Sequence, residues 1–422
     1  MNVVIIGLGY VGLPLAQEAV RVGLNVTGLD IRQATVDGLN AGQSHVDDLS
    51  DADVAGMAAA GFRATADPAS VDPLPDVTVI CVPTPLSESD GPDLAAVKSA
   101  TETAAKLLKP GALVVLESTT YPGTTDEIVR PMLEKASGLA VGIDFHLAFS
   151  PERIDPGNER FGMRNTPKVV GGLTPACTDA AAAFYGQVCD TVVKAKSARE
   201  AEMAKLLENT YRHVNIALVN EMAIFCRELE VDLWDAIRCA ATKPFGFQPF
   251  YPGPGVGGHC IPIDPNYLSY KVRTLGYPFR FVELAQEING RMPGYVTERA
   301  AELLNRNAQP LNGARVLLLG VTYKRDIADQ RESPARPIAR KLRARGAAVA
   351  YHDPYVPDWQ VDEQAVPRAE DLDAEVATAD LVILLQAHQV YDLAQVARTA
   401  RLMLDTRGVV PKTPAAPHVE TL

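Results

Sequence analysis

Residues 250–264 read Phe-Tyr-Pro-Gly-Pro-Gly-Val-Gly-Gly-His-Cys-Ile-Pro-Ile-Asp, and the interpretation of the whole chain depends on this stretch. Four glycines and three prolines among fifteen residues exclude a helix or an inner strand. The stretch is therefore predicted to be a loop whose bare backbone approaches another group closely. It ends on the thiol of Cys260 and the carboxylate of Asp264, a combination typical of a covalent active site. The alternative is a turn-rich connector with a buried cysteine.

Composition narrows the class of protein. The chain has 422 residues, enough for two or three domains, and its formal net charge of -12 disfavours nucleic acid and anionic membranes as partners. The six cysteines include no CxxC pair and the seven histidines show no metal-ligand spacing, so neither a disulfide framework nor a metal site is predicted. Without a leader-like or membrane-spanning apolar run, a cytoplasmic protein is expected.

The N-terminal stretch predicts a dinucleotide site. An apolar strand at 3–6 is followed by Gly7-Leu8-Gly9-Tyr10-Val11-Gly12, a helical pattern at 13–22, and a second strand at 26–29 that ends in Asp30. The glycines permit a tight turn and close approach of a pyrophosphate, and the acid is placed for a ribose hydroxyl. Asp30 would repel a 2′-phosphate, which favours NAD over NADP, whereas Arg32 is the one argument for NADP.

Three further predicted strands end in polar residues. The strands at 77–82, 112–117 and 146–149 are followed by Thr84, by Thr119, and by Glu152 with Arg153, respectively. Ligands of parallel α/β sheets bind beyond the carboxyl ends of the strands. Each residue alone suits an ordinary loop, but three on successive strand ends favour a site.

The middle segment is predicted to be helical. Ser197-x-x-Glu200 matches a capping box and opens an apolar periodicity of roughly 30 residues, or about 45 Å of helix. Lys205 and Asn209 share one face of this helix, with Arg212 near the same line. A solvated polar stripe is the alternative reading of these residues. The length of the helix predicts packing against a second subunit, hence a homodimer. Another helix is predicted through 281–291, interrupted at Met292-Pro293.

The last third repeats the β-α-β pattern without a Gly-x-Gly-x-x-Gly motif. A polar linker at 307–312 precedes predicted strands at 315–319, 347–351 and 379–385. A nucleotide other than a second dinucleotide is expected there, with Arg407 as a contact, and the tail after Pro411 is expected to be disordered. The predicted fold is α/β, with two Rossmann-like domains joined by a long central helix and a helical middle domain. The expected boundaries are 1–196, 197–306 and 307–422.

Taken together, these motifs resemble the nucleotide-sugar 6-dehydrogenases of the UDP-glucose/GDP-mannose dehydrogenase family, from residue 1 to about 410. The markers are Gly7–Gly12, Cys81-Val82-Pro83-Thr84-Pro85, Glu117-Ser118-Thr119, Pro151-Glu152, Lys205 with Asn209, Gly257-Gly258-His259-Cys260, Asp264, and Lys324 with Arg331. The segment 243–264 looks closest to the branch that oxidises UDP-N-acetylhexosamines, although UDP- and dTDP-glucose enzymes carry similar loops.

The resemblance implies oxidation of a sugar C6 alcohol to a carboxylate while two NAD⁺ are reduced. It gives Cys260 the role of nucleophile, and Lys205 and Asn209 that of oxyanion donors. It gives Asp264 a role in ordering water, Glu152 one in thioester hydrolysis, and Thr119 one in positioning water. The implied cofactor contacts are Gly7, Gly9, Tyr10, Val11, Gly12, Asp30, Arg32, Thr84, Thr119, Glu152, Lys324 and Arg331. The implied substrate contacts are Glu152, Arg153, Lys205, Asn209, Arg212, Phe250, Tyr251, Gly253, Gly255, Gly257 and Arg407.

Two other functions are weighed against this one. A two-electron β-hydroxyacid dehydrogenase would share the NAD fold and the Lys-x-x-x-Asn helix, but the thiol and the third β-α-β segment speak against it. An NAD-sensing protein without turnover is disfavoured because thiol, lysine, asparagine and carboxylate are all retained. The residues do not reveal which sugar or base is bound.

Overall fold

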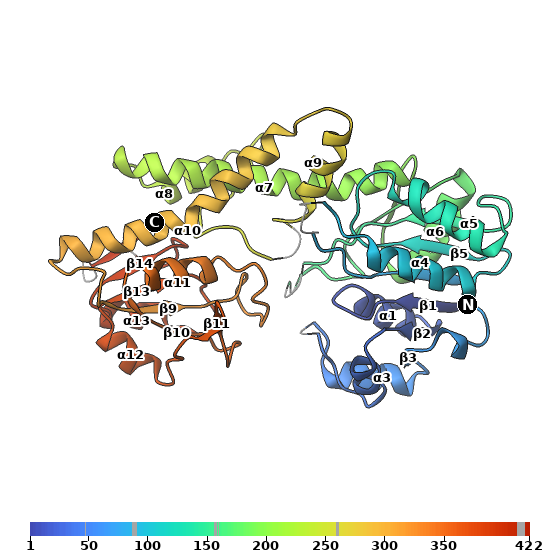
Figure 1. Ribbon diagram of the computed structural model, residues 1–422, viewed down its shortest axis with the longest axis horizontal. Coiled ribbons are helices and arrows are strands. Elements are labelled where there is room, and N and C mark those ends of the chain that lie inside the picture. The colour runs from blue at the N-terminus through green and yellow to red at the C-terminus, as the bar shows by residue number, and fades with distance from the viewer. Residues whose placement is uncertain (47, 87–90, 156–157, 159, 259–260, 412–417) are drawn as a thin grey trace. The chain divides into compact units, whose positions relative to one another are not determined.

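The computed structural model describes residues 1–422 except 47, 87–90, 156–157, 159, 259–260 and 412–417. The chain forms two compact units (Figure 1). The first comprises Met1–Glu208 with Asn266–Pro278, and the second comprises Asn209–Pro265 with Phe279–Leu422. Both are α/β units built on largely parallel sheets, as the alternating sequence pattern predicts.

The first unit is built on an eight-stranded sheet, counted over its described residues, with the order β3-β2-β1-β4-β5-β6-β7-β8. Neighbouring strands are parallel except β6 and β7, which pair antiparallel. Because β1 lies between β2 and β4, the strand order reverses beside it, which is where α/β sheets bind their ligands. The strands are β1 Asn2–Ile6, β2 Asn25–Leu29, β3 Arg63–Thr65, β4 Val77–Ile80, β5 Leu113–Leu116, β6 His146–Phe149, β7 Lys168–Gly172 and β8 Val192–Lys194.

Helices cover both faces of this sheet. Val3 and Ile5 of β1 pack into one core with α1 and α6, whereas Val4 and Ile6 pack into another with α4 and α5. Alternate residues of a strand point to opposite faces, which explains the uninterrupted apolar runs. The helices are α1 Gly12–Arg21, α2 Gln33–Asn40, α3 Asp51–Ala59, a 3₁₀ turn at Pro68–Ser70, α4 Ala95–Leu107, a π turn at Thr125–Val129 that leads into α5 Arg130–Ser137, and α6 Pro175–Val188.

The second unit carries a parallel sheet in the order β10-β9-β13-β14-β15. One face packs on α11 together with α8, α10 and the C-terminal part of α7, and the other packs on α12 and α13. The strands are β9 Arg315–Leu319, β10 Ala348–His352, β13 Leu381–Leu384, β14 Met403–Asp405 and β15 Val419–Thr421, with a small hairpin of β11 Gln360–Val361 and β12 Gln364–Ala365. Its helices are α8 Leu233–Ala241, α10 Arg280–Arg306, α11 Ala335–Ala344, α12 Leu372–Thr378 and α13 Leu393–Thr399. Two helices are divided between the units: α7 Ala198–Glu228 belongs to the first unit up to Glu208, and α9 Asp264–Thr274 belongs to it from Asn266.

Two expectations about secondary structure are wrong. α10 continues through Pro293 to Arg306, because buried Met292, Pro293 and Val296 pack into the core and outweigh the lost helical hydrogen bond. The missing N–H at Pro293 releases the carbonyl of Asn289 from that bond, and this carbonyl faces Gly255. The tail is also not entirely irregular, since β15 pairs with β14.

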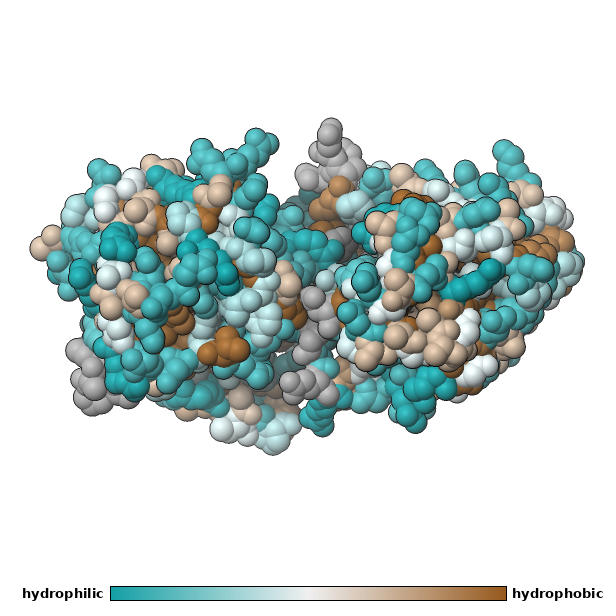
Figure 2. Space-filling model, turned by 90° about the horizontal axis from the view of Figure 1, so that it is seen from below, coloured by the Kyte–Doolittle hydropathy of each residue, from teal (hydrophilic) through white to brown (hydrophobic). Residues whose placement is uncertain are grey.

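The surface is mostly hydrophilic on the face that Figure 2 shows. Apolar side chains form small separate spots on this face. Among the described residues, no helix combines the length and the apolar character needed to cross a membrane.

Candidate active site

The turn after β1 has the geometry that a dinucleotide needs. Gly7 has φ +93°, and a Cβ there would come within 2.5 Å of the carbonyl oxygen of Cys81. A Cβ on Gly12 would overlap the carbonyl oxygen of Gly7, so the start of α1 packs directly on the turn. A Cβ on Gly9, in contrast, would have no atom within 4 Å. The backbone is therefore open beside the N-terminus of α1, where a pyrophosphate fits.

The carboxylate of Asp30 lies at the end of β2, next to this turn. It accepts hydrogen bonds from the backbone N–H groups of Leu8 at 3.1 Å and Arg32 at 2.9 Å. The exposed guanidinium of Arg32 lies 3.6 Å from the same carboxylate. Asp30 thus partly neutralises the positive charge of Arg32, which an NADP 2′-phosphate would need for binding. Tyr10 and Val11 are half-buried on the turn.

Lys205 and Glu152 form a buried ion pair in the first unit. The Lys205 amine donates to the backbone carbonyl of Glu152 at 2.6 Å and to its carboxylate at 3.1 Å. The other carboxylate oxygen accepts from the backbone N–H of Ile154. α7 supplies the lysine and the carboxyl end of β6 supplies the glutamate, so two elements fix the position of the amine. A buried, fixed cation can stabilise a developing oxyanion.

The other strand-end residues of the first unit have different surroundings. Thr84 is buried, and its carbonyl oxygen accepts a hydrogen bond from the hydroxyl of Tyr267. Thr119 is half-buried directly after β5. Arg153 donates to Glu208 at 2.7 Å and to the carbonyl of Pro167 at 2.6 Å. A phosphate bound by Arg153 would have to compete with Glu208.

Glu202 supports the loop after Thr119, and sequence reasoning missed it. Its buried carboxylate accepts from the backbone N–H groups of Gly123 at 2.6 Å and Thr125 at 2.9 Å, and from the Thr125 hydroxyl at 2.7 Å. Burial raises the pKa of Glu202 from 4.5 to about 7, although these three donors act in the opposite direction. A glutamate in the first turns of a long helix gives no sequence signal for this role.

The raised pKa of Glu202 predicts a pH-dependent stability. Between pH 4.5 and about 7 the folded state binds more protons than the unfolded state, so the contribution of Glu202 to the free energy of unfolding falls as pH rises. In urea unfolding, the free energy of unfolding of the wild type should fall by about 2–3 kcal/mol between pH 5 and pH 8 relative to that of Glu202→Gln. The exposed Glu200→Gln is the control. If the wild type and Glu202→Gln differed in free energy of unfolding by the same amount at pH 5 and pH 8, the raised pKa of Glu202 would be contradicted.

In the second unit, Asn209 and Asp264 hold each other in place. The Asn209 amide donates to the Asp264 carboxylate at 2.6 Å, and both side chains are buried. Asp264 is the first residue of α9, and Asn209 follows Lys205 by four positions on α7. Arg212 is exposed. Cys260 and His259 lie outside the described residues.

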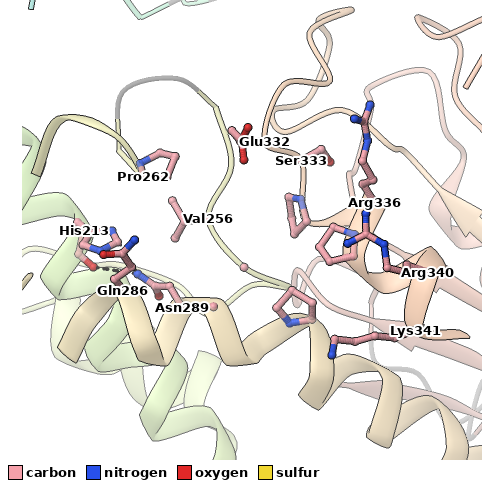
Figure 3. A pocket seen from close by; sticks show the side chains of 15 residues that line it. His213, Val256, Pro262, Gln286, Asn289, Glu332, Ser333, Arg336, Arg340 and Lys341 are labelled. Carbon is pink, nitrogen blue, oxygen red and sulfur yellow. Dashed lines mark hydrogen bonds between the residues drawn. The ribbon is translucent and has the colours of Figure 1, made fainter. Parts of the chain in front are cut away.

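A polar network ties the glycine-rich loop to two helices. The N–H of Gly253 donates to Asn220 of α7 at 2.9 Å, and Asn220 donates to Asn289 of α10 at 2.9 Å. Asn289 in turn lies 3.4 Å from Nδ1 of His213 (Figure 3). Burial lowers the pKa of His213 to about 4, so the imidazole is neutral at physiological pH. The loop is thus fixed by uncharged groups.

The loop lines a cavity of about 420 Å³ within the second unit. One side of this cavity carries His213, Gln286 and Asn289, and the other carries Glu332, Ser333 and the basic residues of α11 (Figure 3). These basic residues are Arg336, Arg340 and Lys341. Arg340 also pairs with the exposed Asp362.

Arg407 lies beside the loop at the carboxyl end of β14. A Cβ on Gly253 would come within 3.1 Å of its Nη1 atom, so glycine leaves room for the guanidinium. Arg407 donates through Nε to the carbonyl of Leu385 at 2.6 Å, and its own carbonyl accepts from the Trp234 indole at 3.1 Å. Burial lowers the pKa of Arg407 to about 10, so it remains a cation at neutral pH and can bind a phosphate.

The C-terminal end of the loop packs on residues 323–334. The N–H of Gly258 donates to the carbonyl of Arg331 at 3.2 Å, and a Cβ on Gly258 would strike the ring of Tyr323. Arg331 is exposed and pairs with Asp329, and the next residue after Tyr323 is the half-buried Lys324. The start of the loop is more open. The ring of Phe250 lies 5.7 Å from that of Tyr211, and Tyr251 is exposed.

Gly257→Ala should displace this loop. Its Cβ would lie 2.7 Å from the carbonyl oxygen of Glu332 and 2.8 Å from Cβ of Tyr323, so the backbone has to move. We expect KM for the nucleotide sugar that the sequence resemblance implies to rise on the order of 10-fold or more. The control is Gly294→Ala in α10, where a Cβ meets no atom within 4 Å. Steady-state kinetics of both variants check the prediction, and an unchanged KM in Gly257→Ala would contradict it.

Comparison with known proteins agrees with this geometry. Three family models match in succession: the NAD binding domain of the UDP-glucose/GDP-mannose dehydrogenase family at residues 1–189, its central domain at 199–291, and its UDP binding domain at 317–412. The chain belongs to the UDP-glucose/GDP-mannose dehydrogenase family. It is an NAD-dependent oxidoreductase, and the open turn at Gly9 and the position of Asp30 fit that cofactor.

Curated relatives and solved structures of this family resemble the chain over most of its length. A UDP-N-acetyl-D-glucosamine 6-dehydrogenase from Pseudomonas aeruginosa is 37% identical over 84% of this chain and 83% of its own length. A UDP-N-acetyl-D-mannosamine dehydrogenase from Salmonella typhi is 33% identical over 96% of this chain and 98% of its own. The solved UDP-D-ManNAc dehydrogenase from Pyrococcus horikoshii has a TM-score of 0.90 at 31% identity, covering 100% of this chain and 99% of that chain.

Proposed function

We propose that this family member oxidises C6 of a UDP-linked N-acetylhexosamine to the carboxylate and reduces two NAD⁺ per sugar. The observation that carries the oxidation itself is the pair of anchored donors on α7. The Lys205 amine is fixed by Glu152, and the Asn209 amide, four positions later, is fixed by Asp264. Such preorganised donors stabilise the oxyanion of a reacting sugar carbon.

The reaction needs a base, a nucleophile and a water molecule. A base takes the proton of the C6 hydroxyl while the hydride leaves for NAD⁺, which gives an aldehyde. The thiolate of Cys260 adds to that aldehyde and forms a thiohemiacetal, and a second hydride leaves for a second NAD⁺ to give a thioester. Water then attacks the thioester carbon, the C–S bond breaks, and the acid and the thiolate are released.

The residues receive these roles in the proposal. Lys205 and Asn209 stabilise the oxyanions, Asp264 orders water and transfers protons, Glu152 assists hydrolysis, and Thr119 positions water. Contacts to the nucleotide sugar come from Arg407 and the backbone of the glycine-rich loop. Contacts to the cofactor come from Lys324 and Arg331 in addition to the turn after β1. These assignments divide the chain into cofactor, central and nucleotide-binding regions at 1–196, 197–306 and 307–422.

The substrate class rests on the relatives that resemble this chain. Those named above act on UDP-linked N-acetylglucosamine and N-acetylmannosamine. A solved UDP-glucose dehydrogenase from Pyrobaculum islandicum has a TM-score of 0.85 at 25% identity and covers 100% of this chain and 96% of that chain. UDP-glucose is therefore a competing substrate, and dTDP-glucose is another because the sequence does not reveal which base is bound.

NADH formation at 340 nm tests the proposal directly. The panel is UDP-N-acetylglucosamine, UDP-N-acetylmannosamine, UDP-glucose, dTDP-glucose and GDP-mannose, with the product analysed by mass spectrometry. We expect two NADH per sugar and an acid product with a UDP-N-acetylhexosamine. One NADH and a carbonyl product would instead establish a two-electron dehydrogenase. No NADH with any sugar would favour an NAD-sensing protein.

We also propose that two copies associate through α7. Large apolar side chains follow one stripe of this helix at about 3.6-residue spacing, and Leu207 at 64% and Leu218 at 53% are more than half exposed. Leu229, directly after the helix ends, is 66% exposed. Tyr211 and Phe225 lie on the same stripe and are 46% exposed each. A monomer rarely exposes so long an apolar patch, and a stripe along one face of a helix can pack on its own copy about a twofold axis.

Leu218→Glu should separate the two copies. A carboxylate in the middle of the stripe would face its own copy across the proposed interface without a compensating cation. Light scattering after size exclusion should give a dimer for the wild type and a shift toward monomer for the variant. Ile143→Glu, at an apolar loop residue that is 84% exposed, is the matched control. A monomeric wild type would contradict the proposal.

A further inference from the structure

A fully buried histidine joins two loops at the carboxyl end of the second sheet. His388 follows β13, and its side chain is completely buried. Its Nε2 atom lies 3.1 Å from the Asp353 carboxylate, which follows β10. Its Nδ1 atom lies 2.9 Å from the backbone nitrogen of Asp326, in the segment after β9. The imidazole thus bridges three strand ends.

These contacts define the tautomer of His388. The backbone N–H of Asp326 can only donate, so Nδ1 must accept and carries no proton. Nε2 therefore bears the proton, and its N–H donates a hydrogen bond to the Asp353 carboxylate. Asp353 is also anchored, because it accepts from the N–H groups of Val321 at 2.7 Å and Tyr355 at 2.9 Å. Each nitrogen of the ring consequently has a separate task.

The segment held by His388 carries Lys324. Gln386 donates to the carbonyl of Tyr323 at 2.6 Å, and the Thr322 hydroxyl donates to the carbonyl of Lys324 at 2.7 Å. Asp326 has φ +62°, an unfavourable backbone conformation for a residue with a side chain. Its N–H is held by His388, and its carboxylate accepts from the N–H of Gln389 at 2.8 Å. The backbone on both sides of Lys324 is therefore fixed by the loop after β13.

The turn after β9 in the second unit resembles the turn after β1 in the first unit. Gly7 and Gly320 both follow the first strand of their sheet with positive φ, and each donates to the carbonyl at the end of the neighbouring strand. Asp30 accepts from Leu8 much as Asp353 accepts from Val321. In the second unit, however, the Asp353 carboxylate is occupied by His388. A carboxylate placed for a ribose in one unit serves as an internal anchor in the other.

We propose that His388 is a positioning residue that fixes the backbone of segment 323–326 and thereby aims the amine of Lys324. The inference rests on the proposed function for the contact between Lys324 and a ligand. The hydrogen bond from Asp326 to Nδ1 performs the positioning, whereas the bond from Nε2 to Asp353 holds the ring.

Two substitutions separate the tasks of the two ring nitrogens. In His388→Asn the side-chain oxygen can take the place of Nδ1 and keep an acceptor for Asp326. In His388→Gln the side-chain amide can take the place of Nε2, which keeps the donor to Asp353 and loses the acceptor. Lys324→Ala identifies which KM depends on the amine, that for NAD or that for the nucleotide sugar.

We expect His388→Gln to raise the same KM that Lys324→Ala raises, on the order of tenfold, with little change in kcat. His388→Asn should stay near the wild type, and the double variant His388→Gln/Lys324→Ala should show no additional loss. A merely structural role predicts that KM rises with the loss of thermal stability, whichever ring nitrogen is replaced. The inference would be overturned if the Asn and Gln variants raised KM equally, or if each raised KM only as far as its melting temperature fell.

Hydrogen–deuterium exchange of the ligand-free protein separates this inference from the proposed function. Amides in 321–327 should lose protection in His388→Gln and keep it in His388→Asn. If the wild type oxidises no nucleotide sugar, the proposed function fails while this difference still supports the positioning of the segment. Protection that is the same in both variants would overturn it.

Discussion

Lys205→Ala is expected to lower kcat on the order of 10²-fold or more, as removal of a preorganised oxyanion donor does. The Lys205 amine bonds to both the carbonyl and the carboxylate of Glu152 and is itself buried. Alanine removes the donor and leaves the Glu152 carboxylate buried without its cation, so both the oxyanion step and the later hydrolysis should suffer. Steady-state and single-turnover NADH formation measure the loss.

A matched surface pair separates this effect from a general change in charge. Lys194 also pairs with a carboxylate in the first unit, Asp179, but both side chains are exposed. Lys194→Ala should therefore leave kcat unchanged, since exposed ion pairs contribute little. If Lys205→Ala turns over as fast as Lys194→Ala, Lys205 has no part in the chemistry.

Cys260→Ser is expected to abolish steady-state formation of the acid while binding of sugar and NAD survives. A serine hydroxyl is a far weaker nucleophile than a thiolate near neutral pH, so the covalent intermediate should not form at a useful rate. Loss of a nucleophile commonly costs several orders of magnitude in kcat. Product analysis by mass spectrometry and calorimetric titration with each ligand test the two parts of this expectation.

Cys239→Ser is the control for the loss of a thiol. Cys239 is exposed in α8, and its replacement should leave turnover intact. Full turnover by Cys260→Ser, with two NADH per sugar, would remove the thiol from the mechanism. Trapping of the substrate on Cys239 instead of Cys260 would do the same.

Local chemistry explains how much of the structure could be predicted. The turn at Gly7 and the acid Asp30 were predictable because a tight turn requires glycine and because the acid ends the next apolar run. The strands of both units were recognisable as apolar runs followed by polar residues. Lys205 and Asn209 could be paired because helical spacing alone puts them on one face.

Long-range packing explains what could not be predicted. Pro293 reads as a helix end, but the core contacts of α10 carry the helix past it. β15 follows a Pro/Ala-rich stretch and forms only because β14 offers a parallel edge. Glu202 and His388 act on residues 77 and 62 positions away, respectively, and no local pattern marks such partners.

The indole of Trp234 gives this enzyme a built-in optical reporter. Its N–H bonds to the backbone of Arg407, and its ring lies against Gly408. The other tryptophan of the chain, Trp359, packs edge to face with Tyr351 within the core and can serve as an internal reference. A phosphate bound to Arg407 would alter the electric field at the Trp234 indole and leave that at Trp359 unchanged. Emission could thus follow nucleotide capture separately from hydride transfer.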